Sequence, residues 1–221
     1  MLLGARQFFE RRGAPPLPYD ARVLYIETDG LGAYIDTGVT PTYQSIIEST
    51  IQSIDVPLLD NTALVSNPLF GAASSSSPVI GMNLALIAQP GNGVFKPTQP
   101  NMLASATPPS YDKNMHDIRL GSGIFDFDGI SIGANTISTS RVIGVFCLGS
   151  RGSFPTSTSP QYGYTNTRFY SCKIYTGGVL VFDGIPVRKD GVAYIYDRVS
   201  GRLCGNAGAS GTSVTYGPDK S

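Results

Sequence analysis

The sequence predicts an all-β protein whose strands form an antiparallel sandwich or barrel. Short runs of alternating apolar and polar residues recur along the chain, and turn-forming Gly, Pro, Asn and Asp separate them. The 221 residues include 26 Gly and 16 Pro but no Trp, and only 14% of them are charged. This composition favours tight turns over helices, while 41% hydrophobic content is typical of a chain with a packed core.

The first predicted strands lie between residues 23 and 55. Segments 23–27 (VLYIE) and 33–36 (AYID) flank Asp29-Gly30, a pair of residues that suits the turn of a hairpin. Residues 45–55 (SIIESTIQSID) form a long β-branched run with interleaved polar residues, which predicts a strand with one buried face. We therefore expect a hairpin followed by a long strand.

Two further strand patterns lie in the middle of the chain. His116, Ile118 and Leu120 fall on one face of their segment, so a packed or hydrogen-bonded histidine is expected there. In the stretch FDFDGISIG, Asp128-Gly129 can adopt the positive φ angles of a type I′ turn, which predicts a second hairpin.

The closing stretch, 168–208, predicts several half-buried strands joined by corners. Alternation sets Phe169, Ser171, Lys173 and Tyr175 on one face and Tyr170, Cys172 and Ile174 on the other. The predicted corners are Gly177-Gly178, Asp183-Gly184, Asp190-Gly191 and Ser200-Gly201. Few of these residues resemble catalytic groups, so this stretch is expected to be structural.

Residues 1–20 are predicted to form an anchor and a proline-rich connector ahead of a single domain over residues 21–221. The apolar side chains that could share one face of a short helix are Leu2, Leu3, Phe8 and Phe9. Pro15, Pro16 and Pro18 would end that helix and form an extended connector. Because so short a helix is marginal alone in water, its apolar face is expected to dock on a partner; a frayed terminus is the alternative.

Charge and cysteine usage exclude several classes of function. The net charge is zero, with 16 basic and 16 acidic residues, so no field attracts nucleic acid or anionic lipid. Cys147, Cys172 and Cys204 are far apart and odd in number, which argues against a disulfide framework and against a zinc site. Cys147 and Cys172 lie in apolar strand-like runs and are expected to be buried free thiols; one disulfide among the three cysteines is the alternative. We expect no membrane span and no cleaved secretion leader.

Two stretches resemble one family of known proteins. Residues 25–39 (YIETDGLGAYIDTGV) resemble the opening of the concanavalin A-like, laminin-G-like jelly-roll domains, with departures at Asp29 and at 31–33. Residues 168–208 resemble the family's closing motif, although 182–184 and Cys204 depart from it. The positions that fit the closing motif are Arg168, Tyr170, Ser171, Lys173, Ile174, Tyr175, Pro186, Gly191, Tyr196, Asp197, Val199, Gly201, Asn206, Ala207 and Gly208. The middle segment 115–129 is also similar, and together these matches span most of residues 23–217.

The resemblance implies a jelly-roll β-sandwich of a kind found in gut bacteria and their phages. Several members carry an arginine-bearing start followed by the residues Leu-Pro-Tyr-Asp, which residues 17–20 match. The resemblance also implies that the chain is a surface or virion protein, although folds of this type host many functions.

Catalytic patterns of the related glucanases are incomplete in this chain. These enzymes carry their carboxylates on one strand as E-x-D-x-(x)-E, but here Glu27 and Asp29 run into a turn and the third acid is missing. Asp126 and Asp128 face one way, although an Asp in a hairpin commonly supports the turn. His116 is the only histidine and no nucleophile elbow accompanies it. A glycoside hydrolase is therefore the least favoured function.

Ligand-binding candidates lie in or beside the long loops. The glycan-binding candidates are Tyr111, Arg151, Tyr162, Tyr164 and Asn166; the alternative is that the tyrosines fill an edge of the sandwich or a subunit contact. No cofactor is expected apart from calcium at the rim. Asp60, Asn61, Asp112 and Asn114 could contribute to such a calcium site, but no spacing motif assigns a ligand and turn formation is favoured.

Taken together, these observations favour a non-enzymatic virion structural or decoration protein, a phage head or tail-fibre module with an adhesive surface that could bind glycans. We expect it on the virion surface after synthesis in the host cytoplasm, bound to other virion proteins through its N-terminus and assembled as a homo-oligomer. The alternative is a stand-alone carbohydrate-binding module of the bacterial cell surface.

Overall fold

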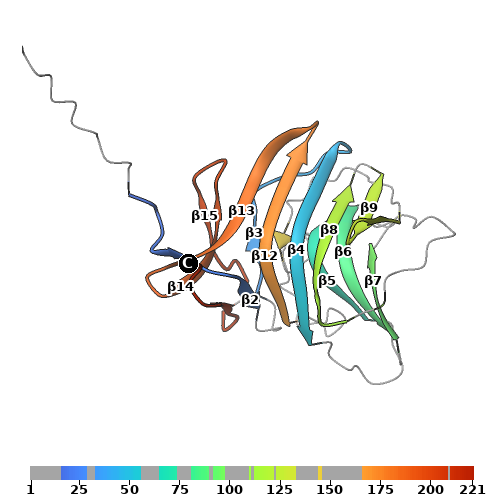
Figure 1. The fold of residues 1–221 in the computed structure, drawn as a ribbon. Helices are drawn as coiled ribbons and strands as arrows, with labels where there is room; N and C mark the ends of the chain where they lie inside the picture. Colours follow the sequence, from blue (N-terminus) through green and yellow to red (C-terminus); the bar gives the residue numbers. More distant parts are fainter. Residues whose placement is uncertain are drawn as a thin grey trace, which may run out of the picture.

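The computed structural model describes residues 16–28, 33–55, 65–73, 81–89, 92–97, 110, 112–121, 123–132, 144–145, 166–208 and 210–221. Throughout these ranges the regular elements are antiparallel β-strands, and none of the described residues is helical (Figure 1). The predicted all-β class is thereby confirmed. No described helix is long and apolar enough to cross a membrane. The predicted anchor residues Leu2, Leu3, Phe8 and Phe9 lie outside the described residues.

The larger sheet has eleven strands. Its main path runs through β10 (Ile130–Ser131), β9 (Ile124–Phe127), β8 (Met115–Gly121), β4 (Ser45–Asp55), β12 (Asn166–Thr176), β13 (Val179–Lys189), β14 (Val192–Asp197) and β15 (Leu203–Cys204). Off this path, β1 (Ala21–Arg22) pairs with β13, and β2 (Ile26–Thr28) pairs with β12 and with β16 (Val214–Tyr216). Strands distant in sequence, such as β4 and β12, are therefore direct neighbours.

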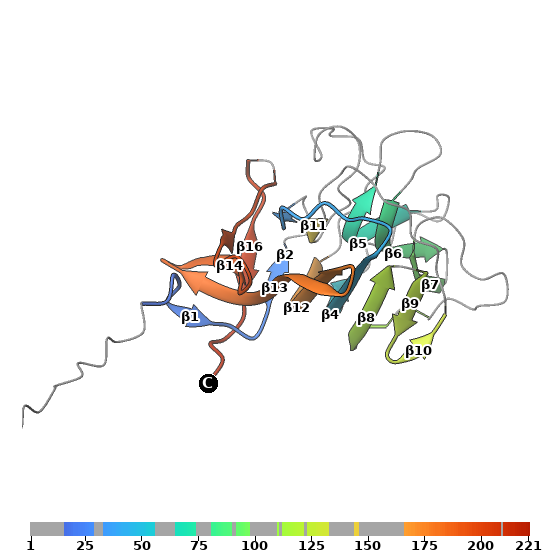
Figure 2. The same ribbon diagram turned by 90° about the horizontal axis from the view of Figure 1, so that it is seen from above.

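The smaller sheet has five strands and lies against one face of the larger sheet. Its order is β3 (Ile35–Asp36), β11 (Gly144–Val145), β5 (Val65–Ala73), β6 (Gly81–Gln89) and β7 (Asn92–Pro97). β5 and β6 lie behind β4 and β8 in Figure 1 and form a separate layer in Figure 2. Two stacked antiparallel sheets make the fold sandwich-like.

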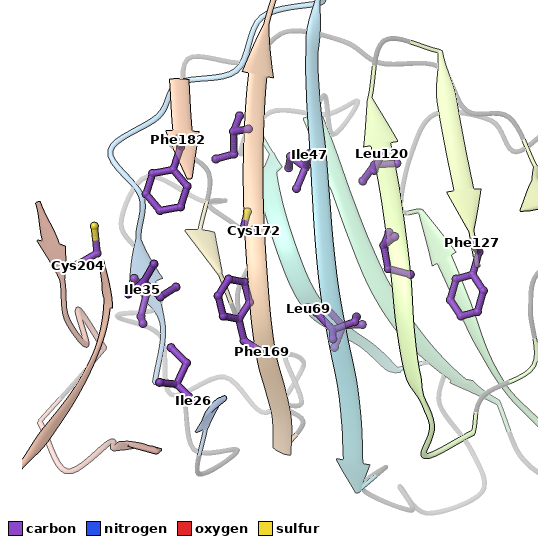
Figure 3. Close-up of a cluster of buried hydrophobic side chains, with 14 of the residues drawn as sticks. Ile26, Ile35, Ile47, Leu69, Leu120, Phe127, Phe169, Cys172, Phe182 and Cys204 are labelled. Atoms are coloured by element: carbon purple, nitrogen blue, oxygen red, sulfur yellow. The ribbon is translucent and has the colours of Figure 1, made fainter. Parts of the chain in front are cut away.

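The hydrophobic core fills the space between the two layers (Figure 3). Ile47 from β4, Phe169 from β12 and Phe182 from β13 are almost completely buried, and Leu69 from β5 reaches the same cluster. On β4, buried residues alternate with half-buried ones, so this strand presents one face to the core and the other outward. The strand predicted over 45–55 is confirmed with the same bounds.

The predicted hairpin turns are confirmed at three places. Asp128-Gly129 between β9 and β10 has φ angles of 50° and 77°, as a type I′ turn requires. Asp190-Gly191 joins β13 to β14 with φ angles of 50° and 74°. Gly177-Gly178 joins β12 to β13 with φ angles of 58° and 79°. Both residues of each pair occupy the left-handed region, where Gly and Asp are tolerated best.

The predicted hairpin of segments 23–27 and 33–36 is wrong. β2 pairs with β12 and β16 in the larger sheet, whereas β3 pairs with β11 in the smaller one. Ile26 and Ile35 are both fully buried in the common core, so the chain crosses between layers instead of turning back within one. Alternation alone does not distinguish these two arrangements.

The predicted corner at Asp183-Gly184 is also wrong, because both residues lie inside the continuous strand β13. A glycine is needed at position 184 because the neighbouring side chains leave little room for a Cβ atom. A Cβ atom at this position would lie 2.5 Å from Phe182 and 2.7 Å from Ile195, both of which belong to the core. The glycine therefore marks close packing within a strand.

The predicted facing of residues 169–175 fails at one position. The register between β12 and β4 shifts between Phe169 and Ser171, so Tyr170 is the extra residue of a β-bulge. Because the bulge reverses the alternation, Phe169 enters the core together with Cys172, while Ser171 and Lys173 face outward. A one-residue insertion of this kind leaves no mark in the hydrophobic pattern.

Cys172 is a free, buried thiol as predicted, and Cys204 is also free and buried. Burial raises the pKa of the Cys172 thiol, and the carboxylates of Asp183 and Asp197 raise it further. Burial also raises the pKa of Cys204, against the opposing influence of Arg202. Both thiols lie in the core (Figure 3). Cys147 lies outside the described residues.

Candidate functional site

The candidate site lies on the outer face of the larger sheet, on strands β4, β8, β9 and β12. Core residues such as Ile47 and Ile118 alternate with outward residues such as Glu48 and Arg119. The register of the strands then decides which outward side chains become neighbours. Glu48 is directly opposite Arg119 on one side and Lys173 on the other.

The first row of neighbours carries charges of alternating sign. Arg119 Nε lies 3.4 Å from Glu48 Oε1, and Arg119 Nη1 lies 3.7 Å from Asp126 Oδ2. One arginine thus pairs with the carboxylates of two flanking strands. Lys173 stands at the other end of the row, opposite Glu48. Cross-strand pairs of opposite charge stabilise a sheet modestly when they are exposed to water.

The second row is a chain of hydrogen bonds that crosses three strands. The Ser171 hydroxyl donates to Thr50 Oγ1 over 3.1 Å, and the Thr50 hydroxyl donates to Asp117 Oδ1 over 2.6 Å. All the protons in this chain point toward Asp117. Ser171 Oγ therefore keeps its lone pairs available for a donor from outside the protein.

The two rows border a hollow of about 340 Å³ on this face. Its lining consists of Glu48, Ser49, Thr50, Asp117, Ile118, Arg119, Asp126, Gly129, Ser171 and Lys173. The lining combines carboxylates, cations and hydroxyls at fixed positions on paired strands. Such a surface can hold a polar ligand by several hydrogen bonds at once.

A second polar cluster lies around His116, next to the hollow. The ring is buried, with Nδ1 2.7 Å from Asp128 Oδ2 and Nε2 2.9 Å from Asp112 Oδ1. Asp128 also accepts the Asp117 amide, at 2.9 Å. Burial alone would raise the pKa of Asp112, but hydrogen bonds from the Asn114 amide and His116 lower it overall. The expectation of a hydrogen-bonded core histidine is confirmed, and Asp128 supports the turn as predicted.

The carboxylate of Glu27, considered above for catalysis, takes part in a packed ion pair. Arg168 Nε donates to Glu27 Oε2 over 2.7 Å, and the guanidinium lies 4.3 Å from the centre of the Tyr25 ring. The hydrogen bond to Glu27 raises the pKa of Arg168. Tyr170 stacks beside Tyr25 and donates its hydroxyl to Gln52 Oε1 over 2.7 Å. These groups bind one another and join β2, β4 and β12.

Most of the predicted loop candidates cannot be placed. Tyr111, Arg151, Tyr162 and Tyr164 lie outside the described residues, whereas Asn166 is half-buried at the start of β12, opposite Asp55.

Of the residues considered for calcium, Asp60 and Asn61 are likewise outside. Asp112 Oδ1 accepts the Asn114 amide at 2.7 Å, which is the turn-forming role. Within the described ranges no group of three or more His, Cys, Asp or Glu side chains could hold a metal ion.

The residues of the hollow were not identified from the sequence. Polar side chains two residues apart, as in Glu48 and Thr50 or Asp117 and Arg119, indicate one outward face each. Nothing in the sequence states that these faces belong to adjacent strands, because β4, β8 and β12 are far apart in the chain.

No protein-family model matches the chain, and no curated protein matches it either. The resemblance to laminin-G-like domains therefore depends on the quoted residues alone.

Proposed function

We propose that the chain is a non-enzymatic binding module whose domain, of the laminin-G-like jelly-roll type, presents a glycan-binding surface on a virion. The hollow on β4, β8, β9 and β12 carries this proposal. Its lining offers hydrogen-bond donors from Arg119 and Lys173 and acceptors from Asp117, Asp126 and Ser171. Sugar hydroxyls donate and accept at the same time, so they match a surface that presents both kinds of group.

A binding role fits the pairing of the carboxylates better than hydrolysis does. A retaining glycosidase needs one carboxylic acid and one nucleophilic carboxylate that flank the scissile bond. Glu48 and Asp126 both pair with Arg119, and Glu27 pairs with Arg168. Each of these carboxylates therefore already has an arginine partner within the protein, which Glu48 and Asp126 share.

A glycan array, probed with the wild-type protein and Ser171→Ala, tests the binding site. This variant removes the Ser171 hydroxyl, which donates the first of the hydrogen bonds that run across the floor of the hollow to Asp117. We expect at least one class of glycan to bind the wild type, and an affinity about tenfold lower for the variant, the loss of one hydrogen bond. The matched control Ser131→Ala alters an exposed serine of β10 and should bind like the wild type. An array without signal, or equal binding by Ser171→Ala, contradicts the proposal.

The assembly role is tested at the N-terminus. Tyr19 stacks on Tyr196 with ring centres 5.0 Å apart, and Asp20 Oδ2 accepts the Asp190 amide at 2.8 Å. Leu17 is 63% exposed, whereas Pro18 and Tyr19 are half-buried, so the connector becomes covered after residue 17. Deletion of residues 1–18 should leave the domain folded but abolish its incorporation into particles. Incorporation of the truncated protein would favour the alternative, a bacterial surface module without an assembly role.

A further inference from the structure

Lys173 is the cation of the hollow that forms no ion pair with a described carboxylate. It stands opposite Glu48 on β4 and Asp183 on β13. Glu48 is paired with Arg119 at 3.4 Å, and Asp183 is paired with Arg198 at 2.6 Å. Among the described residues no ion pair includes Lys173, although it has an acidic neighbour on each side. Its ammonium group is therefore available to an anion in the hollow.

Asp117 is the corresponding carboxylate on the other side of the hollow. Its Oδ1 accepts the Thr50 hydroxyl at 2.6 Å, and in the part of the chain that the structure describes it forms no ion pair. The side chain is exposed. Its second oxygen accepts no hydrogen bond from the described residues, so a cationic or hydroxyl donor can bind there.

The two unpaired charges lie on β12 and β8, with β4 between them. Lys173 is level with Glu48 and Asp117 is level with Thr50, so they are offset by two residues along the strands. Ordinary strand spacing and rise separate their Cα atoms by about 12 Å. Of the remaining charged groups of the hollow, Glu48 and Asp126 share one cation, Arg119, as their ion-pair partner.

We propose that the hollow binds a zwitterionic oligosaccharide, whose carboxylate pairs with Lys173 and whose ammonium group pairs with Asp117. This inference rests on the proposed glycan-binding function and adds the chemical class of the ligand. Intervening sugar hydroxyls donate to Ser171 Oγ, which starts the hydrogen-bond chain to Asp117. A ligand with only one charge leaves the other protein charge unpaired, and electrostatic complementarity therefore selects for both.

A glycan matches this surface better than a zwitterionic peptide does. Extended peptides commonly bind by adding a strand to a free sheet edge, where backbone groups supply the hydrogen bonds. β4 is paired on both sides, by β12 and by β8, so the floor of the hollow presents side chains only. The outward side chains of this floor on β4 and β12 include the hydroxyls of Thr50 and Ser171 and the carboxylate of Glu48, which match sugar hydroxyls.

Isothermal titration with four forms of one tetrasaccharide tests this inference. The parent form alternates glucuronic acid with glucosamine that carries free amines. The second form is N-acetylated and keeps the carboxylates, the third is carboxyl-reduced and keeps the amines, and the fourth has both changes. We expect the parent to bind most tightly and each loss of charge to weaken binding about tenfold.

Two variants connect each ligand charge to one residue. Lys173→Gln should weaken binding of the parent about tenfold and leave binding of the carboxyl-reduced form unchanged. Asp117→Asn retains an acceptor for Thr50; it should weaken binding of the parent and leave the N-acetylated form unchanged. Lys220→Gln and Asp190→Asn are matched controls at exposed positions elsewhere and should bind like the wild type.

The possible failures are distinguishable. Equal binding of all four forms, or a preference for a zwitterionic peptide of similar length, overturns the inference about the ligand class. Equal binding that is still weakened by Ser171→Ala leaves the proposed glycan site intact. The absence of binding to any form, together with a silent glycan array, contradicts the proposed function itself.

Discussion

Asp197 is expected to be a major source of stability in this fold, because its buried carboxylate fixes the corner after β14. Its side chain is 3% exposed. Oδ1 accepts the amides of Asp183 at 2.9 Å and Val199 at 3.0 Å, and Oδ2 accepts the Ser200 amide at 3.2 Å and the Ser200 hydroxyl at 2.5 Å. Replacement by Ala leaves all of these donors without their acceptor.

The size of the effect follows from these four bonds. A hydrogen bond to a charged group contributes roughly 1.5–3 kcal/mol, but bonds to one shared acceptor do not add fully. We therefore expect Asp197→Ala to lower the free energy of unfolding by about 3–5 kcal/mol, the range seen when one partner of a buried charged pair is removed. Asp197→Asn keeps one acceptor but turns an amide group toward the Ser200 donors, so a loss of about 1–3 kcal/mol is expected.

The same contacts predict an acid dependence. Burial alone would raise the pKa of Asp197, but the hydrogen bonds from Asp183, Ser200 and Val199 outweigh it and lower the pKa below its ordinary value. A carboxyl whose pKa is lower in the folded state stabilises the fold at neutral pH. That contribution starts to disappear below the unfolded pKa, about 4, and is lost as the pH falls through the folded pKa.

Urea unfolding at pH 7 and at pH 3 measures both effects. The free energy of unfolding of the wild type should be lower at pH 3 than at pH 7, and that of Asp197→Asn should fall by less. The difference in free energy of unfolding between the two proteins is therefore smaller at pH 3. Asp190→Asn, at an exposed turn position, is the matched control and should differ from the wild type by less than about 0.5 kcal/mol. A loss below about 1 kcal/mol for Asp197→Ala, or an equal pH dependence in Asp197→Asn, would refute the reasoning.

Three further predictions concern the core. Gly184→Ala places a Cβ 2.5 Å from Phe182 and should lower the free energy of unfolding, measured in urea, by about 1–3 kcal/mol. A change within about 0.5 kcal/mol would show that the neighbouring core side chains move to accommodate the methyl group. Ser53 Oγ is buried without a hydrogen-bond partner among the described residues, so Ser53→Ala should leave stability unchanged or raise it by about 1 kcal/mol, and a clear loss would reveal a hidden partner. Cys172 and Cys204 are buried with raised pKa values, so peptide mapping should find them unalkylated by iodoacetamide at pH 8 until the protein is unfolded in urea; rapid native labelling of either contradicts their placement.

Local features of the fold were predictable because they depend on neighbouring residues. The strand over 45–55 follows from alternation, and the turn at Asp128-Gly129 follows from the positive φ angles that these residues tolerate. The assignment of β2 and β3 to different sheets was not predictable, because both strands carry the same pattern. The bulge at Tyr170 was missed for a similar reason, since one inserted residue reverses the facing of a strand without altering its composition.

The candidate site was less predictable than the fold. Its residues come from β4, from the neighbouring strands β8 and β9, and from β12, which are far apart in the chain. Only the register of β8, β4 and β12 brings Arg119, Glu48 and Lys173 into one row. The binding residues expected from the sequence were instead three tyrosines, Arg151 and Asn166 in or beside the loops, of which Asn166 alone lies among the described residues. The charge of Lys173 is visible in the sequence, whereas its lack of an ion-pair partner depends on how Arg119 and Arg198 are placed.

Chemical-shift mapping by NMR with the strongest glycan from the array tests most directly whether the hollow is the binding site. Saturable shifts are expected for amides of 48–50 on β4, 117–119 on β8 and 171–173 on β12. The β13–β14 turn around Asp190 should not respond. Saturable shifts confined to residues outside these three segments would place the ligand elsewhere and contradict the account.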